Sequence, residues 1–125
     1  MFETLEINRM AHSLAKHAGA RMGVIAQNIA NADTPGYLAK DLPDFAIFYQ
    51  DHGNDLRHNR AGHMLGSQFD PGPALVRQDE TSPNGNSVSL ETEMVKSAEA
   101  RQQHDMALSV YSASSSLLRV ALGRK

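Results

Sequence analysis

The chain has 125 residues with 12 basic and 14 acidic side chains, and this near-neutral balance excludes an electrostatic footprint for nucleic acid or an anionic membrane. Cysteine and tryptophan are absent, which excludes a disulfide framework and thiol chemistry and leaves few large groups to anchor a core. This length supports one domain at most, and no apolar run reaches the roughly 18 residues of a membrane-spanning helix. We therefore expect no nucleic-acid partner and no direct membrane insertion.

Residues 1–32 are predicted to form a long amphipathic helix. Its apolar side chains recur at steps of three and four, the spacing that lines one helix face. These residues are Ile7, Ala11, Leu14, Ala18, Met22, Ile25 and Ile29. At a rise of about 1.5 Å per residue, the stripe would reach about 33 Å. Gly19 and Gly23 lower the helix propensity, but they leave room for another backbone to come close.

Residues 33–50 are predicted to form a turn followed by an apolar anchor segment. Pro35 cannot extend a helix, because its ring removes a donor and clashes with the preceding turn. Pro35 and Gly36 suit the central positions of a type II turn, the second of which needs a positive φ. Asn31 or Ala32 falls near the helix C-cap, where an Asn accepts left-handed geometry. The apolar run at 45–49 fits a strand, a short helix or an anchor on a neighbour equally well.

Residues 51–87 are predicted to be irregular, because they are rich in Gly, Asp, Asn, His and Pro. A short β-hairpin around Asp70-Pro71-Gly72 is the one regular feature expected, with residues 74–76 as one strand. A loop this long is unusual inside a compact domain. It is therefore either disordered in the free chain or stabilised by neighbours.

Residues 88–125 are predicted to form a second long helix. Ser89 can cap its N-terminus, Glu91 and Glu93 suit its first turn, and Gly123 is a natural stop. Its second half carries two apolar stripes. The first consists of Leu108, Tyr111, Ser115, Leu118 and Leu122, and the second of Met106, Val110, Ala113, Leu117 and Val120. A helix that is apolar on two faces needs partners on two sides.

These patterns predict a mainly α fold in which two long terminal helices pack as a helical hairpin or coiled coil. The two chain ends would then lie at the same end of the hairpin, and the irregular Gly/Pro-rich middle has room for a short β-hairpin. One N-terminal helix can cover only one stripe of the C-terminal helix, so the other would form an exposed apolar patch of a kind that is rare on monomers. We therefore expect another copy or another protein to bury it.

The segment at the end of the first helix resembles a motif of the axial proteins of the bacterial flagellum, the rod, hook and hook-associated subunits. The motif reads Ala-Asn-x-x-Thr-Pro-Gly-Tyr, and residues 30–37 match every fixed position. Within that family the chain looks most like a protein of the proximal rod. This choice rests on its short length, on Lys40-Asp41 followed by Leu42 and Phe45, and on Pro83-Asn84-Gly85-Asn86-Ser87-Val88 before the last helix. Leu38 departs from the basic residue of many relatives.

The resemblance implies a structural subunit of the basal-body rod. Such a subunit assembles through its terminal helices into a helical tube that transmits torque from motor to hook. The implied partners are other rod proteins, the rod-to-MS-ring junction protein, the flagellar type III export apparatus and further copies of the chain. The implied location is the periplasmic rod of the basal body, reached without a cleavable signal peptide, and the N-terminus indeed lacks the pattern of one.

Two sets of candidate residues follow. The turn motif comprises Asn28, Ala30, Asn31, Thr34, Pro35, Gly36 and Tyr37. The assembly interface comprises Ile7, Leu14, Met22, Ile25, Ile29, Met106, Leu108, Val110, Tyr111, Leu117, Leu118, Val120 and Leu122. Asn28 and Asn31 are either surface amides or polar groups that fix helix register across an interface.

No catalytic, cofactor-binding or metal site is predicted, and the chain is not expected to be an enzyme. His52, His58 and His63 have irregular spacing, and no Cys supports a zinc site. The serines of the last helix lack a base and an orienting acid. The alternative to a rod subunit is a soluble helical adaptor or regulator that binds one partner helix in a discrete complex.

Overall fold

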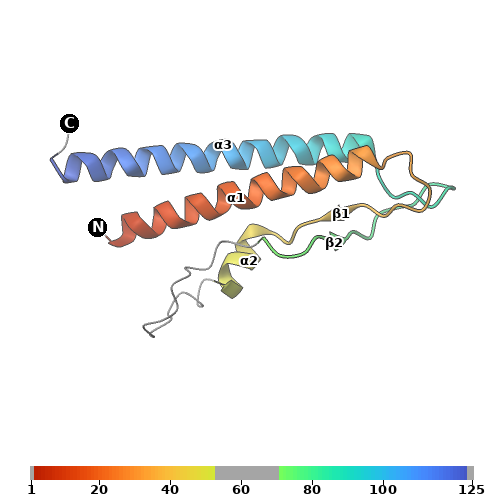
Figure 1. Ribbon diagram of the computed structural model, residues 1–125, viewed down its shortest axis with the longest axis horizontal. Coiled ribbons are helices and arrows are strands. Elements are labelled where there is room, and N and C mark those ends of the chain that lie inside the picture. Colours follow the sequence, from red (N-terminus) through yellow and green to blue (C-terminus); the bar gives the residue numbers. More distant parts are fainter. Residues whose placement is uncertain (1, 53–70, 124–125) are drawn as a thin grey trace.

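The computed structural model describes residues 2–52 and 71–123. Along the chain, the elements are α1 (Phe2–Ala30), β1 (Lys40–Asp41), α2 (Phe45–His52), β2 (Leu75–Val76) and α3 (Leu90–Ala121). Helices α1 and α3 lie side by side and run in opposite directions, so both chain ends lie at the same end of the hairpin (Figure 1). The predicted mainly α fold with packed terminal helices is confirmed. None of the helices described is long and apolar enough to cross a membrane.

Small side chains form most of the seam between α1 and α3. The buried residues at seven-residue steps are Ala11, Ala18 and Ile25 in α1, and Glu93, Ala100, Ala107 and Ser114 in α3. Seven residues is the coiled-coil period, and small groups at the contact let two helices approach closely. The seam extends towards the chain ends, where the Ser114 hydroxyl donates to the Thr4 carbonyl at 3.3 Å. The large apolar side chains are therefore left largely outside the seam.

Both predicted ends of the last helix are confirmed. Ser89 is the N-cap, and its hydroxyl accepts a hydrogen bond from the Thr92 amide at 3.5 Å. At the other end Gly123 has a φ of 68°, which suits glycine after a helix, and its amide donates to the Val120 carbonyl at 3.1 Å. α1 ends at Ala30, so its C-cap falls at Asn31 as predicted, but without left-handed geometry, because among the described residues only glycines have a positive φ.

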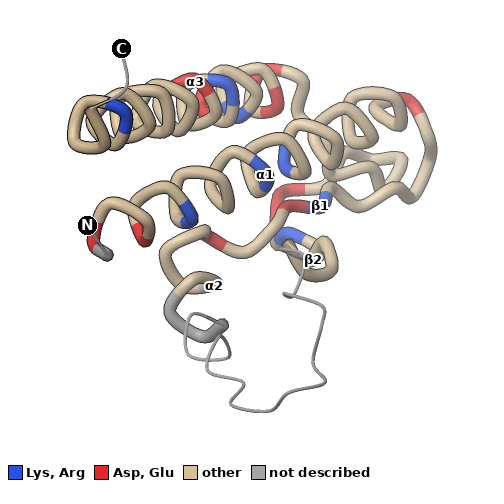
Figure 2. The backbone as a smooth tube through the Cα atoms, turned by 60° about the vertical axis from the view of Figure 1, so that its left-hand side comes forward, with Lys and Arg blue, Asp and Glu red and all other residues tan. Residues whose placement is uncertain are grey.

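The segments 37–52 and 71–80, called the arm below, run back along α1 on the side away from α3 (Figures 1 and 2). Residues 45–52 are helical, which decides among the three structures that the apolar run allowed. Strands β1 and β2 pair antiparallel, with Lys40 opposite Val76 and Asp41 opposite Leu75. The strand predicted at 74–76 is thus confirmed, but it does not pair within a local hairpin. A distant segment supplies the partner, and a turn pattern cannot indicate such a pairing.

Candidate assembly interface

The turn motif packs against the loop that precedes α3. The Tyr37 amide donates to the Thr34 carbonyl at 3.3 Å, and Gly36 has a φ of 74°, as the predicted type II turn requires. The Gly36 amide donates to the Asn84 carbonyl at 3.1 Å. A Cβ added to Gly85 would lie 3.4 Å from the Gly36 Cα, so the two loops meet backbone to backbone at a pair of glycines. The two sequence motifs of the resemblance therefore form one structural unit.

Asn86, in the loop that precedes α3, binds the turn that follows α1. Its side-chain amide donates to the carbonyls of Asn31 at 2.9 Å, Ala32 at 2.9 Å and Thr34 at 2.8 Å. Its side-chain oxygen accepts from the Val88 amide at 2.7 Å, and the residue is buried. These three carbonyls belong to the turn that follows α1, so one distant side chain supplies the donor for this turn.

Asn28 is buried at the point where α1, the arm and α3 meet. Its side-chain nitrogen donates to the Lys40 carbonyl at 2.7 Å and to Glu93 Oε2 at 3.1 Å. Its side-chain oxygen accepts from the Lys40 amide and the Tyr37 hydroxyl, each at 3.1 Å. Asn28 therefore fixes packing inside the chain. It is not a surface amide, and its partners belong to the same chain and not to a neighbouring subunit. Asn31 also bonds locally, with its side-chain nitrogen donating to the Gln27 carbonyl at 2.8 Å.

A second polar contact joins the same elements through Asp41. Its carboxylate accepts from Arg21 at 3.1 and 3.3 Å, from Lys96 at 3.3 Å and from the Leu42 amide at 2.8 Å. Partial burial, the largest single influence, raises the pKa of Asp41. The hydrogen bond and positive charge of Arg21, the Leu42 amide and Lys96 together outweigh it, so the pKa lies below its ordinary value. The carboxylate thus stays charged and ties α1, β1 and α3 together.

The candidate assembly residues occupy different positions. Ile25 is 2% exposed and lies within the α1–α3 seam, so it does not contribute to an outer surface. Leu14, Met22 and Leu118 are half-buried. The remaining candidates are exposed, namely Ile7, Ile29, Met106, Leu108, Val110, Tyr111, Leu117, Val120 and Leu122. Leu117 and Val120 reach 67% and 76% exposure. Both predicted stripes of α3 therefore face outward at least in part.

Further exposed apolar residues lie outside the predicted set. They are Leu5 and Met10 of α1, Leu90, Met94 and Val95 of α3, and Leu38, Ile47, Leu75 and Val76 of the arm. Met94 belongs to a narrow apolar stripe visible in the sequence, whereas the exposure of β2 follows only from its pairing partner. So much exposed apolar area on a small chain is typical of a surface that another protein covers.

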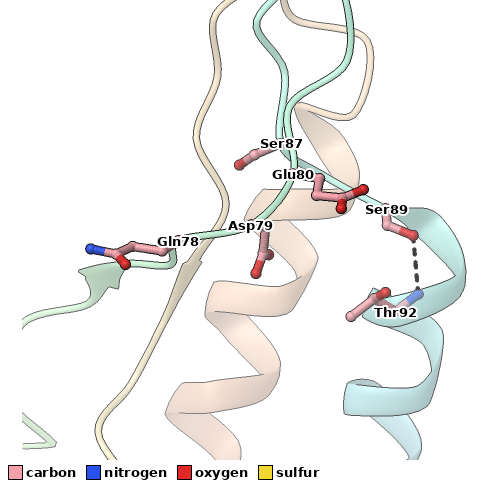
Figure 3. A pocket seen from close by; sticks show the side chains of 6 residues that line it. All are labelled: Gln78, Asp79, Glu80, Ser87, Ser89 and Thr92. Carbon is pink, nitrogen blue, oxygen red and sulfur yellow. Dashed lines mark hydrogen bonds between the residues drawn. The ribbon is translucent and has the colours of Figure 1, made fainter.

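One open hollow of about 420 Å³ lies beside the start of α3 (Figure 3). It is lined by Gln78, Asp79, Glu80, Ser87, Ser89 and Thr92. The Ser89 hydroxyl is engaged by the Thr92 amide, and the Ser87 hydroxyl accepts from the Ala39 amide at 2.7 Å. The residues that line the hollow include no His, Lys or Arg. Within residues 2–52 and 71–123 no cluster of side chains could hold a metal, while His58 and His63 lie outside the described residues.

Comparison with known proteins agrees with this architecture. A family model described as "Flagella basal body rod protein" matches residues 15–37, which include the turn motif. The flagellar basal body rod protein FlgB of Escherichia coli (strain K12) is 36% identical over 104 residues, covering 74% of this chain and 75% of the relative. FlgB of Agrobacterium fabrum (strain C58) is 30% identical over 111 residues, covering 83% of each chain.

FlgB of Salmonella typhimurium (strain LT2) is 33% identical over 102 residues, covering 72% of this chain and 73% of the relative. These relatives are named as rod proteins of the flagellar basal body, a structural family and not a family of enzymes. The chain belongs to the FlgB family of flagellar basal body rod proteins.

Proposed function

We propose that the chain is a structural subunit of the proximal rod of the flagellar basal body and that it assembles through the exposed apolar surface of α1 and α3. Membership of the FlgB family supports the first part. The single observation that carries the second is the outward-facing apolar surface of the last turns of α3, where Leu117 and Val120 are more than half exposed. Burying such side chains against a neighbour is favourable by roughly 25 cal/mol per Å² of apolar area.

The geometry of the hairpin suits a helical tube. Apolar surface is present on α1, on two faces of α3 and on the arm, so one copy has several different patches to offer. When unlike patches meet between copies, the contacts do not close on themselves and the assembly continues as a helix. Subunits joined in this way along the rod would transmit torque from the motor towards the hook.

A subunit that transmits torque must also be stiff, and the end of the hairpin near residue 36 supplies stiffness. Polar side chains there have fixed directions and are buried, as Asn28, Asn86 and Glu93 illustrate. Directional hydrogen bonds in a low-dielectric interior favour one arrangement of the elements. The motif thus acts inside the subunit, while the apolar surface acts between subunits.

The family supports assembly with other rod components of the basal body. We further propose self-association within the rod, contact with the rod-to-MS-ring junction protein and export through the flagellar type III apparatus without a cleavable signal peptide. The proposed location within the basal body is the periplasmic rod. Nothing in the comparisons favours the alternative of a helical adaptor that binds one partner.

Replacing Leu117 and Val120 by Asp tests the assembly surface. Both side chains are exposed, so we expect the free variant to remain soluble, with a helix content by circular dichroism that matches the original chain. We expect incorporation into basal bodies and motility to be lost, because buried carboxylates at an interface lack partners. Ser112→Asp, an exposed change on the same helix outside both stripes, is the matched control and should incorporate. Normal incorporation of the double Asp variant would refute the proposal.

A further inference from the structure

The carboxylate of Glu93 is buried where the arm meets the helical hairpin. Its side chain is 0% exposed, although it lies in the first turn of a helix whose neighbouring acidic residue Glu91 faces solvent. Oxygen Oε1 accepts from Arg77 Nη2, and Oε2 accepts from the Asn28 side chain at 3.1 Å. Both oxygens therefore have partners inside the chain, one from the arm and one from α1.

Arg77 brings the opposite charge from the arm, directly after β2. Its backbone amide donates to the Ala39 carbonyl at 2.9 Å, which continues the pairing of β1 and β2. Its guanidinium is 12% exposed, and Nε donates to Asp79 Oδ2 at 2.8 Å. Atom Nη1 is buried and has no hydrogen-bond partner among the described residues. When the arm packs on the hairpin, this guanidinium therefore loses most of its contact with water, and the interaction with Glu93 supplies most of the compensation.

The charges of this pair depend on each other. Burial, the largest influence, lowers the pKa of Arg77, but the hydrogen bond and charge of Glu93, with those of Asp79, raise it above its usual value. Arg77 is thus charged while it is buried. If one partner of a buried ion pair loses its charge, the other is left buried and uncompensated, at a cost well above the net contribution of the intact pair. The remaining charge can regain water only if the arm lifts from the hairpin.

The seam between α1 and α3 involves the charge pair only at one end, through Glu93. It consists mainly of small residues at seven-residue steps, and its far part, around Ala11 and Ser114, lies well away from Glu93 along the helices. The arm can therefore separate from the hairpin while the two helices stay packed. Such a division into parts that open independently is common within one domain.

We infer that Glu93 and Arg77 form a charge lock that holds the arm on the helical hairpin and so fixes the arm's exposed apolar side chains relative to those of α3. The role of this fixed spacing in assembly rests on the proposed function. The lock itself is a property of the single chain, so it is tested without any rod.

Hydrogen exchange on the isolated full chain tests the lock. The informative amides are those of Ala39, Lys40 and Arg77, which donate to the Ser87 hydroxyl, the Asn28 side chain and the Ala39 carbonyl. We expect Glu93→Gln and Arg77→Met each to accelerate their exchange by roughly tenfold or more, with the amides of residues 11–25 unchanged. Glu91→Gln, on the exposed neighbour, should change nothing.

The double variant Glu93→Gln/Arg77→Met separates charge from packing. It leaves no uncompensated charge, and the amide oxygen that Glu93→Gln introduces can still accept from Asn28. Exchange in the arm should therefore return to within roughly threefold of the original rate. Three results would each overturn the lock. They are unchanged exchange in both single variants, equal acceleration of the α1 amides, and a double variant as fast as the single ones.

Incorporation of the unmodified chain into basal bodies is measured in parallel. A chain that shows the expected exchange but never enters a rod would refute the proposed function and leave the lock standing. A chain that enters the rod but shows none of the expected exchange would do the reverse.

Discussion

The two ends of the hairpin are built in opposite ways. At the end near Gly36, polar side chains are buried and bonded to one another across four segments, as around Asn28 and Asn86. At the end with both termini, small residues form the seam and the large apolar residues face outward. The polar contacts of the first end are made within one chain, although Leu90, Met94 and Val95 beside them are exposed, whereas the second end has few such contacts and its large apolar residues are mostly exposed. The difference supports the proposal that one end sets the shape of the subunit and that the other contributes to the surface that joins it to neighbours.

This division follows from the forces at each end. Hydrogen bonds are directional and costly to leave unmade when buried, so they select one geometry. Apolar burial is non-directional and is proportional to area, so it can be completed by any surface that fits. Ordering the exposed side chains costs conformational entropy that the free chain does not recover. We therefore expect the terminal end to gain order when a neighbour covers it.

The largest expected effect comes from breaking the polar end at Asn86. Replacing it by Ala leaves the carbonyls of Asn31, Ala32 and Thr34 without their donor in a buried site. We expect the free energy of unfolding to fall by about 2–4 kcal/mol, measured by urea denaturation. Asn84→Ala is the control, because that exposed side chain accepts a single hydrogen bond from the Asn86 amide. Equal losses in the two variants would contradict the proposed role of the Asn86 side chain.

A smaller effect is expected when either of two glycines is replaced by Ala, and the sign of the change in the free energy of unfolding differs between them. Neither Gly36 nor Gly19 has an atom within 4 Å of an added Cβ, so neither change meets a steric clash with its neighbours. Gly36 has a φ of 74°, so Gly36→Ala should lower the free energy of unfolding by about 1 kcal/mol. Gly19 lies inside α1, so Gly19→Ala should raise it by about 0.8–1 kcal/mol. A Gly36→Ala variant whose free energy of unfolding, measured by thermal or urea unfolding, is unchanged or raised would show that the turn does not need its left-handed residue.

The smallest expected effect concerns acid and the Asp41 contact. The folded-state pKa of Asp41 is below its ordinary value of 3.8, so its stabilising contribution is present at neutral pH and is lost as pH falls through the folded value. Asp41→Asn should therefore be destabilising at pH 7, and the difference from the original chain should shrink steadily below about pH 4. Urea unfolding at a series of pH values measures this. A difference that stays constant down to about pH 3 would exclude an ionic role for Asp41.

Local signals in the sequence predicted the ends of elements. Pro35 and Gly36 forced a turn, Ser89 marked a helix start and Gly123 a helix stop, and each lies where its backbone chemistry requires. The lengths and pairing of the terminal helices also followed from uninterrupted periodicity. These features depend on residues close in sequence, so the chain itself displays them.

Features that depend on distant residues were not predictable in the same way. The predicted stripe of α1 contains the seam residues Ala11, Ala18 and Ile25, but periodicity alone did not show that most of the larger side chains lie outside the seam. Small residues suit a close helix contact better. The partners of Asn28 and Asn86 lie up to 65 residues away. The strand partner of Leu75 and Val76 likewise comes from before α2. A single sequence shows that such polar groups need partners but not which residues provide them.

The contact between Asn86 and the turn after α1 makes the order of synthesis matter. Three carbonyls of this turn receive their donor from a residue 52 to 55 positions downstream. A growing chain that has not yet reached Asn86 therefore lacks the donor that holds this turn. Contacts of such long range also form late in folding, because their closure costs more entropy. The final fold can therefore form only after most of the chain has been synthesised.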